Sequence, residues 1–150
     1  MERISIGLPG SFQFSTTITV RITDLNYGGH VGNDSFLSLI HEARVRFLQS
    51  HGYSELDLEG NGLIMSDMGI EFKKELHYGD EVLVSVSAAG FAPYGFDLFY
   101  LLEIVKAGEK VLSAKAKTGM LCYNYRLKKL ALLPPEALTK LSASNMNTTT

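Results

Sequence analysis

Residues 34–50 read DSFLSLIHEARVRFLQS, and this stretch decides the fold. Apolar side chains recur at Phe36, Ile40, Ala43 and Phe47, which is the spacing of one face of an α-helix. Three leucines widen this face: Leu37, Leu39 and Leu48. Such a broad apolar face needs cover over much of the helix circumference, as a curved sheet would supply. Candidate caps stand at both ends of the helix: Asn33, Asp34 or Ser35 at the start and Gly52 after the end.

Strand patterns lie on both sides of this helix. Residues 12–22 alternate apolar and polar side chains with a period of two, and residues 63–125 resume that alternation. Turn residues interrupt the second region at 77–80, 93–95 and 107–109, so we expect consecutive antiparallel strands joined by short loops. Residues 135–141 predict a short helix. The expected fold class is α+β, a single domain over residues 1–141 with an antiparallel sheet wrapped round one long central helix. The polar residues 142–150 are expected to form a disordered tail.

The composition excludes several classes of protein. The chain has 150 residues, 45% of them apolar and 20% charged, with a net charge of −2, as in an ordinary globular domain. A basic surplus is absent, so we expect no nucleic-acid partner. The apolar run from Leu98 to Leu102 is far shorter than the roughly 18 residues of a membrane helix, and the N-terminus lacks the apolar core of a signal peptide. The single cysteine, Cys122, excludes an internal disulfide; we expect a cytoplasmic protein without a membrane partner.

Polar and ionisable residues gather where the first strand leads into the helix. Residues 24–35 read DLNYGGHVGNDS. Turn and cap chemistry accounts for part of this composition, because Asp, Asn and Gly favour turns and Asn or Ser caps helices. The segment also carries a histidine, and the free N–H groups at a helix start can bind a polarised carbonyl or an oxyanion. The histidines and the lone cysteine show no metal-ligand spacing, so no metal site is expected.

At this segment the sequence resembles the hotdog-fold acyl-CoA thioesterases, the group that includes 4-hydroxybenzoyl-CoA thioesterase. The family reads Asp-x-Asp-x-x-Gly-(His or Val)-Val before the helix, and the matching residues here are DLNYGGHV at 24–31. Glu42-Ala43-Arg44 and the block EFKKELHYGDEV at 71–82 continue the likeness. The resemblance implies a hotdog fold, a homodimer or homotetramer with its active site between two subunits, and hydrolysis of an acyl-CoA substrate without a metal or redox cofactor.

One position departs from the family pattern. In relatives with a catalytic aspartate, that residue is the second acid of the Asp-x-Asp pair, and this chain has Asn26 there. A carboxamide cannot accept a proton from water as a general base. The resemblance therefore leads us to assign proton transfer to His30 and Asp24, positioning to Asn26, a polar active-site role to Asn33 and the oxyanion to backbone N–H groups of residues 28–33. The expected substrate-binding residues are Gly28, Gly29, Val31, Phe36, Met65 and Met68.

Two other functions fit the same scaffold. Asn26 in place of the acid favours a non-catalytic protein that binds acyl-CoA or an acyl carrier. An enoyl-thioester hydratase resembles Asp-x-Asn-Pro-x-His, with the histidine five residues after the aspartate. Here His30 comes six residues after Asp24 and the proline is absent, so the hydratase pattern fits less well.

Overall fold

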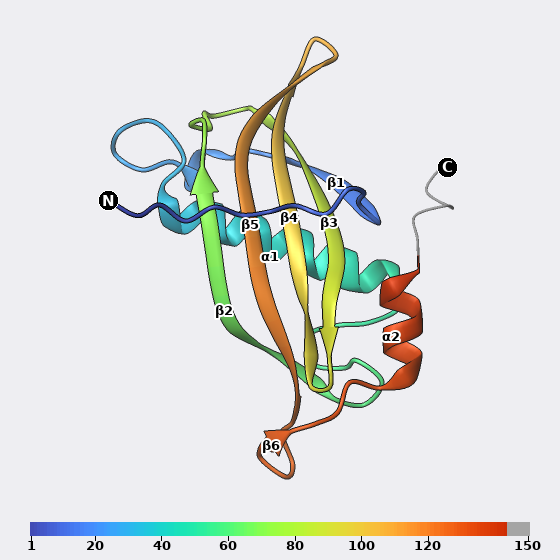
Figure 1. Ribbon diagram of the computed structural model, residues 1–150. Helices are drawn as coiled ribbons and strands as arrows, with labels where there is room; N and C mark the ends of the chain where they lie inside the picture. Colours follow the sequence, from blue (N-terminus) through green and yellow to red (C-terminus); the bar gives the residue numbers. More distant parts are fainter. Residues whose placement is uncertain (144–150) are drawn as a thin grey trace.

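The strand patterns form one antiparallel sheet that curves around a long helix (Figure 1). The structure is a computed structural model, and it describes residues 1–143. The sheet order is β1-β3-β4-β5-β2, and a short β6 pairs with β5. The strands are β1 (Phe14–Thr19), β2 (Gly62–Phe72), β3 (Glu81–Ala92), β4 (Gly95–Lys106), β5 (Glu109–Asn124) and β6 (Lys129–Leu130). The helices are α1 (Asn33–Ser50), α2 (Pro135–Ser142) and the 3₁₀ turn η1 (Ile22–Asp24).

The first strand is shorter than its sequence pattern. β1 ends at Thr19 and the chain then winds into η1, so Ile22 leaves the alternation and is 67% exposed. Strand β2 has a bulge between Met65 and Asp67, and burial does not alternate after it: the residues from Met68 to Glu71 are all half-buried and Phe72 is 46% exposed. A bulge of this kind adds one residue to a strand and bends it.

Helix α1 packs on the concave face of the sheet (Figure 1). The four residues that define its apolar face are at most 3% exposed: Phe36, Ile40, Ala43 and Phe47. Opposite them, Val84, Leu102 and Ala114 lie in register on three neighbouring strands and are fully buried. Leu37, which we expected to widen the apolar face, is wrong as a core residue, because it lies off that face and is 42% exposed.

The start of α1 differs from the prediction, and its end agrees with it. Gly32 is the N-cap residue, and no side chain bonds the first turn, so Asn33, Asp34 and Ser35 are wrong as capping side chains. The chain already adopts its extended cap conformation at Gly32, which places all three residues inside the first turn. Gly52 follows the helix with a φ of +79°, the left-handed conformation that favours glycine there.

Helix α1 carries one buried cationic side chain, that of Arg44. The side chain of Arg44 is 8% exposed, and its Nε donates a hydrogen bond of 3.1 Å to Glu55 Oε2. Its Nη1 donates at 3.4 Å to the hydroxyl of Tyr100, which lies 2.9 Å from Thr118 Oγ1. Burial alone would lower the pKa of Arg44; the contacts with Tyr100 and Glu55 outweigh it and raise the pKa. The helix face is therefore apolar except for one paired charge.

The C-terminal helix and the chain ends complete the described structure. α2 is one residue longer than expected, because Ser142 is its last residue. The helix packs on the core through its buried residues, Ala137 and Leu141. The expected disordered tail falls mainly on residues 144–150, outside the described residues. The N-terminal segment runs across the face of the sheet opposite α1 (Figure 1), where Ile6 N–H donates to a carboxylate oxygen of Glu71 on β2. Within residues 1–143, neither helix is long and apolar enough to cross a membrane.

Candidate active site

Asp24 closes the 3₁₀ turn that follows β1. Its Oδ2 accepts the backbone N–H of Arg21 at 2.8 Å, and its Oδ1 lies 3.6 Å from the Arg21 guanidinium. The residue is only 5% exposed. Both partners of the carboxylate therefore belong to Arg21, and these contacts support a role in holding the turn. The sequence had assigned Asp24 to proton transfer beside His30, and the described contacts give that assignment no support.

The loop after η1 is held by its own hydrogen bonds. Asn26 N–H donates to the carbonyl oxygen of His30 at 2.9 Å, and Gly29 N–H donates to that of Asn26 at 3.2 Å. The side-chain Oδ1 of Asn26 accepts the N–H of Gly28 at 2.8 Å. Gly29 has a φ of +83°, which an L side chain adopts only with strain. This packing turns the chain tightly between Asn26 and His30.

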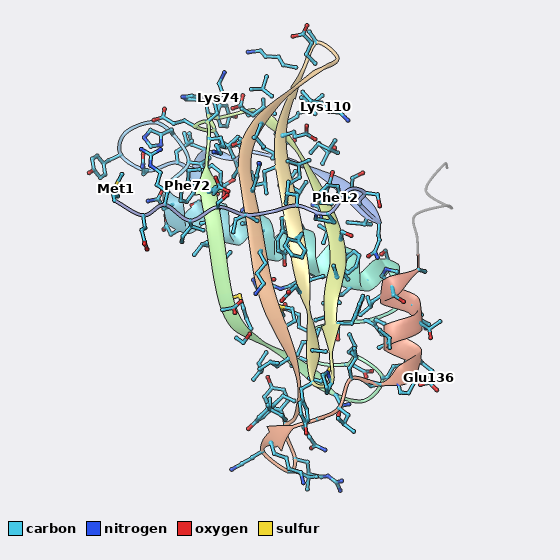
Figure 2. The ribbon with its side chains drawn as sticks, viewed as in Figure 1. Met1, Phe12, Phe72, Lys74, Lys110 and Glu136 are labelled. Carbon is cyan, nitrogen blue, oxygen red and sulfur yellow. The ribbon has the colours of Figure 1, made fainter. Side chains whose placement is uncertain are left out.

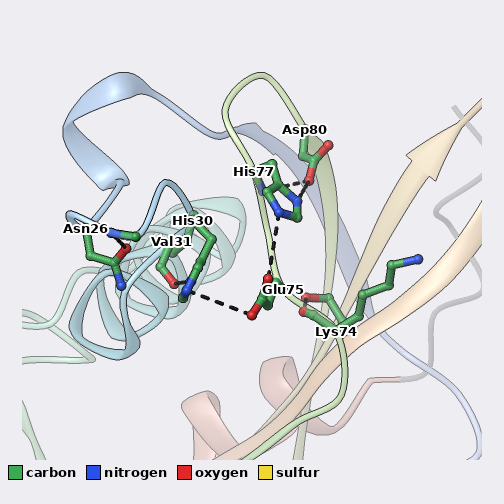
Figure 3. A network of polar contacts seen from close by, with 9 residues as sticks. Asn26, His30, Val31, Lys74, Glu75, His77 and Asp80 are labelled. Carbon is green, nitrogen blue, oxygen red and sulfur yellow. Dashed lines mark hydrogen bonds and ion pairs between the residues drawn. The ribbon is translucent and has the colours of Figure 1, made fainter.

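A second loop, between β2 and β3, docks against the first. Val31 N–H donates to the carbonyl oxygen of Leu76 at 2.8 Å, and His30 pairs with His77 in an isolated antiparallel bridge. This bridge brings Glu75 beside His30, with Oε1 3.8 Å from His30 Nε2 (Figure 3). The other oxygen of Glu75 lies 3.8 Å from His77 Nε2. The two loops thus bring together one carboxylate and two imidazoles. In the sequence, His30 lies 45 residues or more before Glu75 and His77.

A pocket of about 280 Å³ opens where these loops meet the start of α1 and the end of β2. Its apolar wall includes Phe36 and Phe72, whose rings pack edge to face with centroids 5.1 Å apart. Phe72 and the neighbouring Lys74 lie at the end of β2 (Figure 2). The lining residues are His30, Val31, Asn33, Phe36, Phe72, Lys73, Lys74 and Glu75. An aromatic wall with a few polar groups is typical of a small-molecule site.

The helix start supplies hydrogen-bond donors at the edge of this pocket. The first intrahelical bond of α1 runs from Phe36 N–H to the carbonyl oxygen of Gly32, at 3.1 Å. The N–H groups of the preceding helical residues have no acceptor within a helix, and among the described residues no side chain caps them. Asn33, the first of them, lines the pocket.

The donors expected earlier in the loop are engaged elsewhere. Gly28 N–H bonds Asn26, Gly29 N–H bonds the Asn26 carbonyl and Val31 N–H bonds Leu76. The described hydrogen bonds therefore give no support to assigning the oxyanion to the N–H groups of Gly28, Gly29 and Val31. Gly28 and Gly29 are engaged within their own loop, and Val31 is engaged by the pairing of the two loops.

The pocket gathers only part of the predicted set. It is lined by four of the predicted residues: His30, Val31, Asn33 and Phe36. It is not lined by the other six: Asp24, Asn26, Gly28, Gly29, Met65 and Met68. Asn26 and Gly28 stay close, however, since a Cβ at Gly28 would lie 3.2 Å from Asn26 Oδ1 and 3.4 Å from His30 Nε2. Met65 is 48% exposed on β2.

The residues from Phe72 to Glu75 were missed as site residues. They belong to the block 71–82, which we had used only as evidence of family resemblance. Its conspicuous signal is a carboxylate and a histidine, Glu75 and His77, beside the turn 77–80. No group of three or more His, Cys, Asp and Glu residues within residues 1–143 is arranged to hold a metal ion.

Comparisons with known proteins identify the family. A family model described as the thioesterase-like superfamily matches residues 20–141. A 1,4-dihydroxy-2-naphthoyl-CoA hydrolase of Rippkaea orientalis is 27% identical over 111 residues, which are 72% of this chain and 80% of that relative. The crystal structure of a 1,4-dihydroxy-2-naphthoyl-CoA thioesterase from Synechocystis is 26% identical, with a TM-score of 0.72 over 85% of this chain and 94% of that one.

A more distant structure has the same fold. A 4-hydroxybenzoyl-CoA thioesterase mutant in complex with 4-hydroxybenzoyl-CoA is 13% identical, with a TM-score of 0.76 over 86% of this chain and 98% of that one. The antiparallel sheet around one long helix, together with these matches, confirms the hotdog fold expected from the sequence. The chain belongs to the thioesterase-like superfamily.

Proposed function

We propose that this protein hydrolyses an acyl-CoA thioester to the free acid and coenzyme A, at the pocket between the start of α1 and the end of β2. The superfamily match and the relatives named as acyl-CoA hydrolases support the reaction. The observation that carries the proposal is the meeting of His30, the uncapped start of α1 and an aromatic wall in one pocket. The relatives named above act on aryl-CoA compounds, and the Phe36–Phe72 wall suits an aromatic or medium-length acyl group.

The proposed reaction has two steps. Water attacks the thioester carbonyl and forms a C–O bond while His30 accepts the proton from water. The carbonyl oxygen becomes an oxyanion, which the N–H groups at the helix start stabilise, helped by the positive end of the helix dipole. The tetrahedral intermediate then collapses, the C–S bond breaks, and the proton on His30 passes to the departing thiolate. No atom is oxidised or reduced in either step, so the proposal includes no redox cofactor. It also includes no metal ion.

The side chains of Asp24 and Asn26 have supporting roles in this proposal. Asp24 fixes the turn through Arg21, and Asn26 fixes the loop through Gly28. Asn33 lines the pocket and starts α1, and in this proposal its backbone N–H is one of the oxyanion donors.

We propose a homodimer or homotetramer as the working form, in the cytoplasm. β2 is an outer strand of the sheet, and two apolar residues on it are exposed: Met65 at 48% and Phe72 at 46%. An unpaired edge with apolar side chains favours association with a second copy of the chain. Light scattering coupled to size exclusion gives the mass of the assembly and tests this assignment. The one cysteine, buried Cys122, is compatible with a reducing compartment.

A panel of acyl-CoA compounds tests the reaction. Free thiol released from aryl, short-chain and medium-chain substrates is measured for the native chain and for His30→Ala. We expect turnover by the native chain and a loss of roughly 100-fold or more in kcat for His30→Ala, the typical contribution of a general base. No turnover on any substrate, with measurable acyl-CoA binding, would favour instead the non-catalytic binding protein that Asn26 suggests. Loss of crotonyl-CoA absorbance without thiol release would indicate a hydratase.

A further inference from the structure

The pocket contains a carboxylate that the first loop does not provide. Of the described residues that line the pocket, Glu75 alone has a carboxylate side chain. It comes from the loop between β2 and β3, whereas His30 comes from the loop before α1. Since the carboxylate of Asp24 is bonded to Arg21, Glu75 is the acidic group at the imidazole.

The ring nitrogens of His30 have different partners. Nδ1 lies 3.3 Å from the carbonyl oxygen of Val31, so an N–H there donates to that oxygen and leaves Nε2 as the proton acceptor. Nε2 is the nitrogen that faces Glu75, at 3.8 Å from Oε1. The carboxylate therefore stands at the end of the ring that becomes positively charged when His30 takes a proton (Figure 3).

The surroundings of Glu75 leave its carboxylate available to His30. Its other oxygen lies 3.8 Å from His77 Nε2, and the backbone N–H of His77 donates to Asp80 Oδ2 at 2.8 Å, which fixes the His77 end. The neighbouring Lys73 pairs with Glu71 at 3.0 Å, and the side chain of Lys74 extends away from Glu75 (Figure 3). No backbone N–H within the described residues donates to Glu75, and its side chain is 64% exposed, so the fold does not depend on it.

The side chain of Asn26 and the Nε2 end of the His30 ring both flank Gly28. A point 3.4 Å from His30 Nε2, the Cβ position that Gly28 lacks, is also 3.2 Å from Asn26 Oδ1. A carboxylate at residue 26 would therefore lie near His30, but the carboxamide of Asn26 carries no charge and its oxygen accepts the Gly28 N–H.

We propose that Glu75 is the positioning residue of this active site: it supplies, from the loop between β2 and β3, the negative charge that Asn26 lacks, and it stabilises the His30 imidazolium formed during thioester hydrolysis. The inference rests on the proposed function. Glu75 remains ionised throughout; the proton moves from water to His30 Nε2 and then to the thiolate. Because the charge on His30 exists only after proton transfer, Glu75 acts on the rate of the chemical step and not on substrate binding.

The test compares Glu75→Gln in two backgrounds, with release of thiol from the best acyl-CoA of the panel as the assay. In the native background we expect kcat to fall about tenfold with KM within a factor of two. Asn26→Asp keeps an acceptor for Gly28 N–H and restores a charge near His30. In that background we expect Glu75→Gln to cost less than a factor of two, a rescue that a merely structural role would not produce.

The controls separate the possible failures. Glu81→Gln, the same change at an exposed residue that starts β3, is expected to leave kcat unchanged. Thermal unfolding of Glu75→Gln should match the native protein, because the side chain is exposed. Three results would overturn this inference alone, with the native chain active: full kcat in Glu75→Gln, an equal fall in kcat in both backgrounds, or a change in KM without a change in kcat. A native chain without activity on any thioester overturns the proposed function and this inference together.

Discussion

Removing the hydroxyl of Tyr100 tests whether the buried polar chain beneath α1 stabilises the fold. Phe keeps the ring, so Tyr100→Phe removes one oxygen and creates almost no cavity. The hydroxyl of Thr118, 2.9 Å away and 0% exposed, then loses its partner in a site closed to water. An unsatisfied buried polar group costs about 1–3 kcal/mol. The hydrogen bond from Arg44 is longer, at 3.4 Å, and adds little. We expect the free energy of unfolding to fall by about 2 kcal/mol.

Urea unfolding measures this loss. The midpoint should fall while the slope of the free energy against urea stays constant, and the melting temperature should fall by roughly 4–8 °C. Thr118→Val alone should destabilise the protein similarly. The double variant replaces both partners by apolar groups, so it should cost at least about 1 kcal/mol less than the sum of the two single variants. A single variant within about 0.5 kcal/mol of the native protein, or strict additivity, would refute the role of this bond.

Three further perturbations have outcomes that follow from local structure. Gly95→Ala should destabilise the protein by about 3 kcal/mol or prevent folding, because the new Cβ would lie 1.9 Å from the backbone oxygen of Met120. Circular dichroism and urea unfolding measure this loss, and native-like stability would contradict the close packing of Gly95. Burial, with the charge of Lys140, lowers the pKa of His51 below 6.5, so the unfolded chain binds the proton more readily and stability is lost as the pH falls from 6.5 through the lowered pKa. His51→Gln should flatten this part of the profile of urea midpoint against pH, and an unchanged profile would exclude His51 as its source. Burial raises the pKa of the Cys122 thiol to about 11. A disulfide reagent at pH 8 should therefore leave the native chain unmodified and label one thiol after unfolding. Rapid labelling of the native chain would contradict the burial.

The elements with long, regular patterns could be predicted from the sequence. The helix prediction of 34–50 differs from α1 by one residue, and the turns at 77–80, 93–95 and 107–109 all separate strands. These patterns succeed because each element buries one face against the others, and burial of one face imposes a fixed period on the sequence. The likeness to hotdog-fold thioesterases supplied the way in which the elements are assembled, which periodicity alone leaves open.

The errors arose where a distant partner decides the outcome. Arg44 lies beside the apolar face of α1 and carries a charge, so the helix pattern alone gives no reason to bury it. Its burial depends on the Tyr100 hydroxyl and on Glu55, which the fold brings from β4 and from the loop after α1. The ion pair of Glu42 with Arg46, by contrast, follows from sequence spacing alone, because the two residues lie one turn apart on the same helix; their distance is 2.9 Å.

The same distinction explains the candidate site. His30, Asn33 and Phe36 were found because they belong to one continuous segment, the loop and first turn that precede and begin α1. Glu75 could not be found in that way, because its proximity to His30 depends on the hydrogen bond between Val31 and Leu76, which joins two loops. That bond also withdraws the Val31 N–H from oxyanion binding and leaves the donors of the helix start for that task. The pairing of the two loops thus has two effects on the chemistry: it positions an acid beside the imidazole, and it engages the Val31 N–H, so that the proposed donors are those at the start of α1, where the helix dipole is positive.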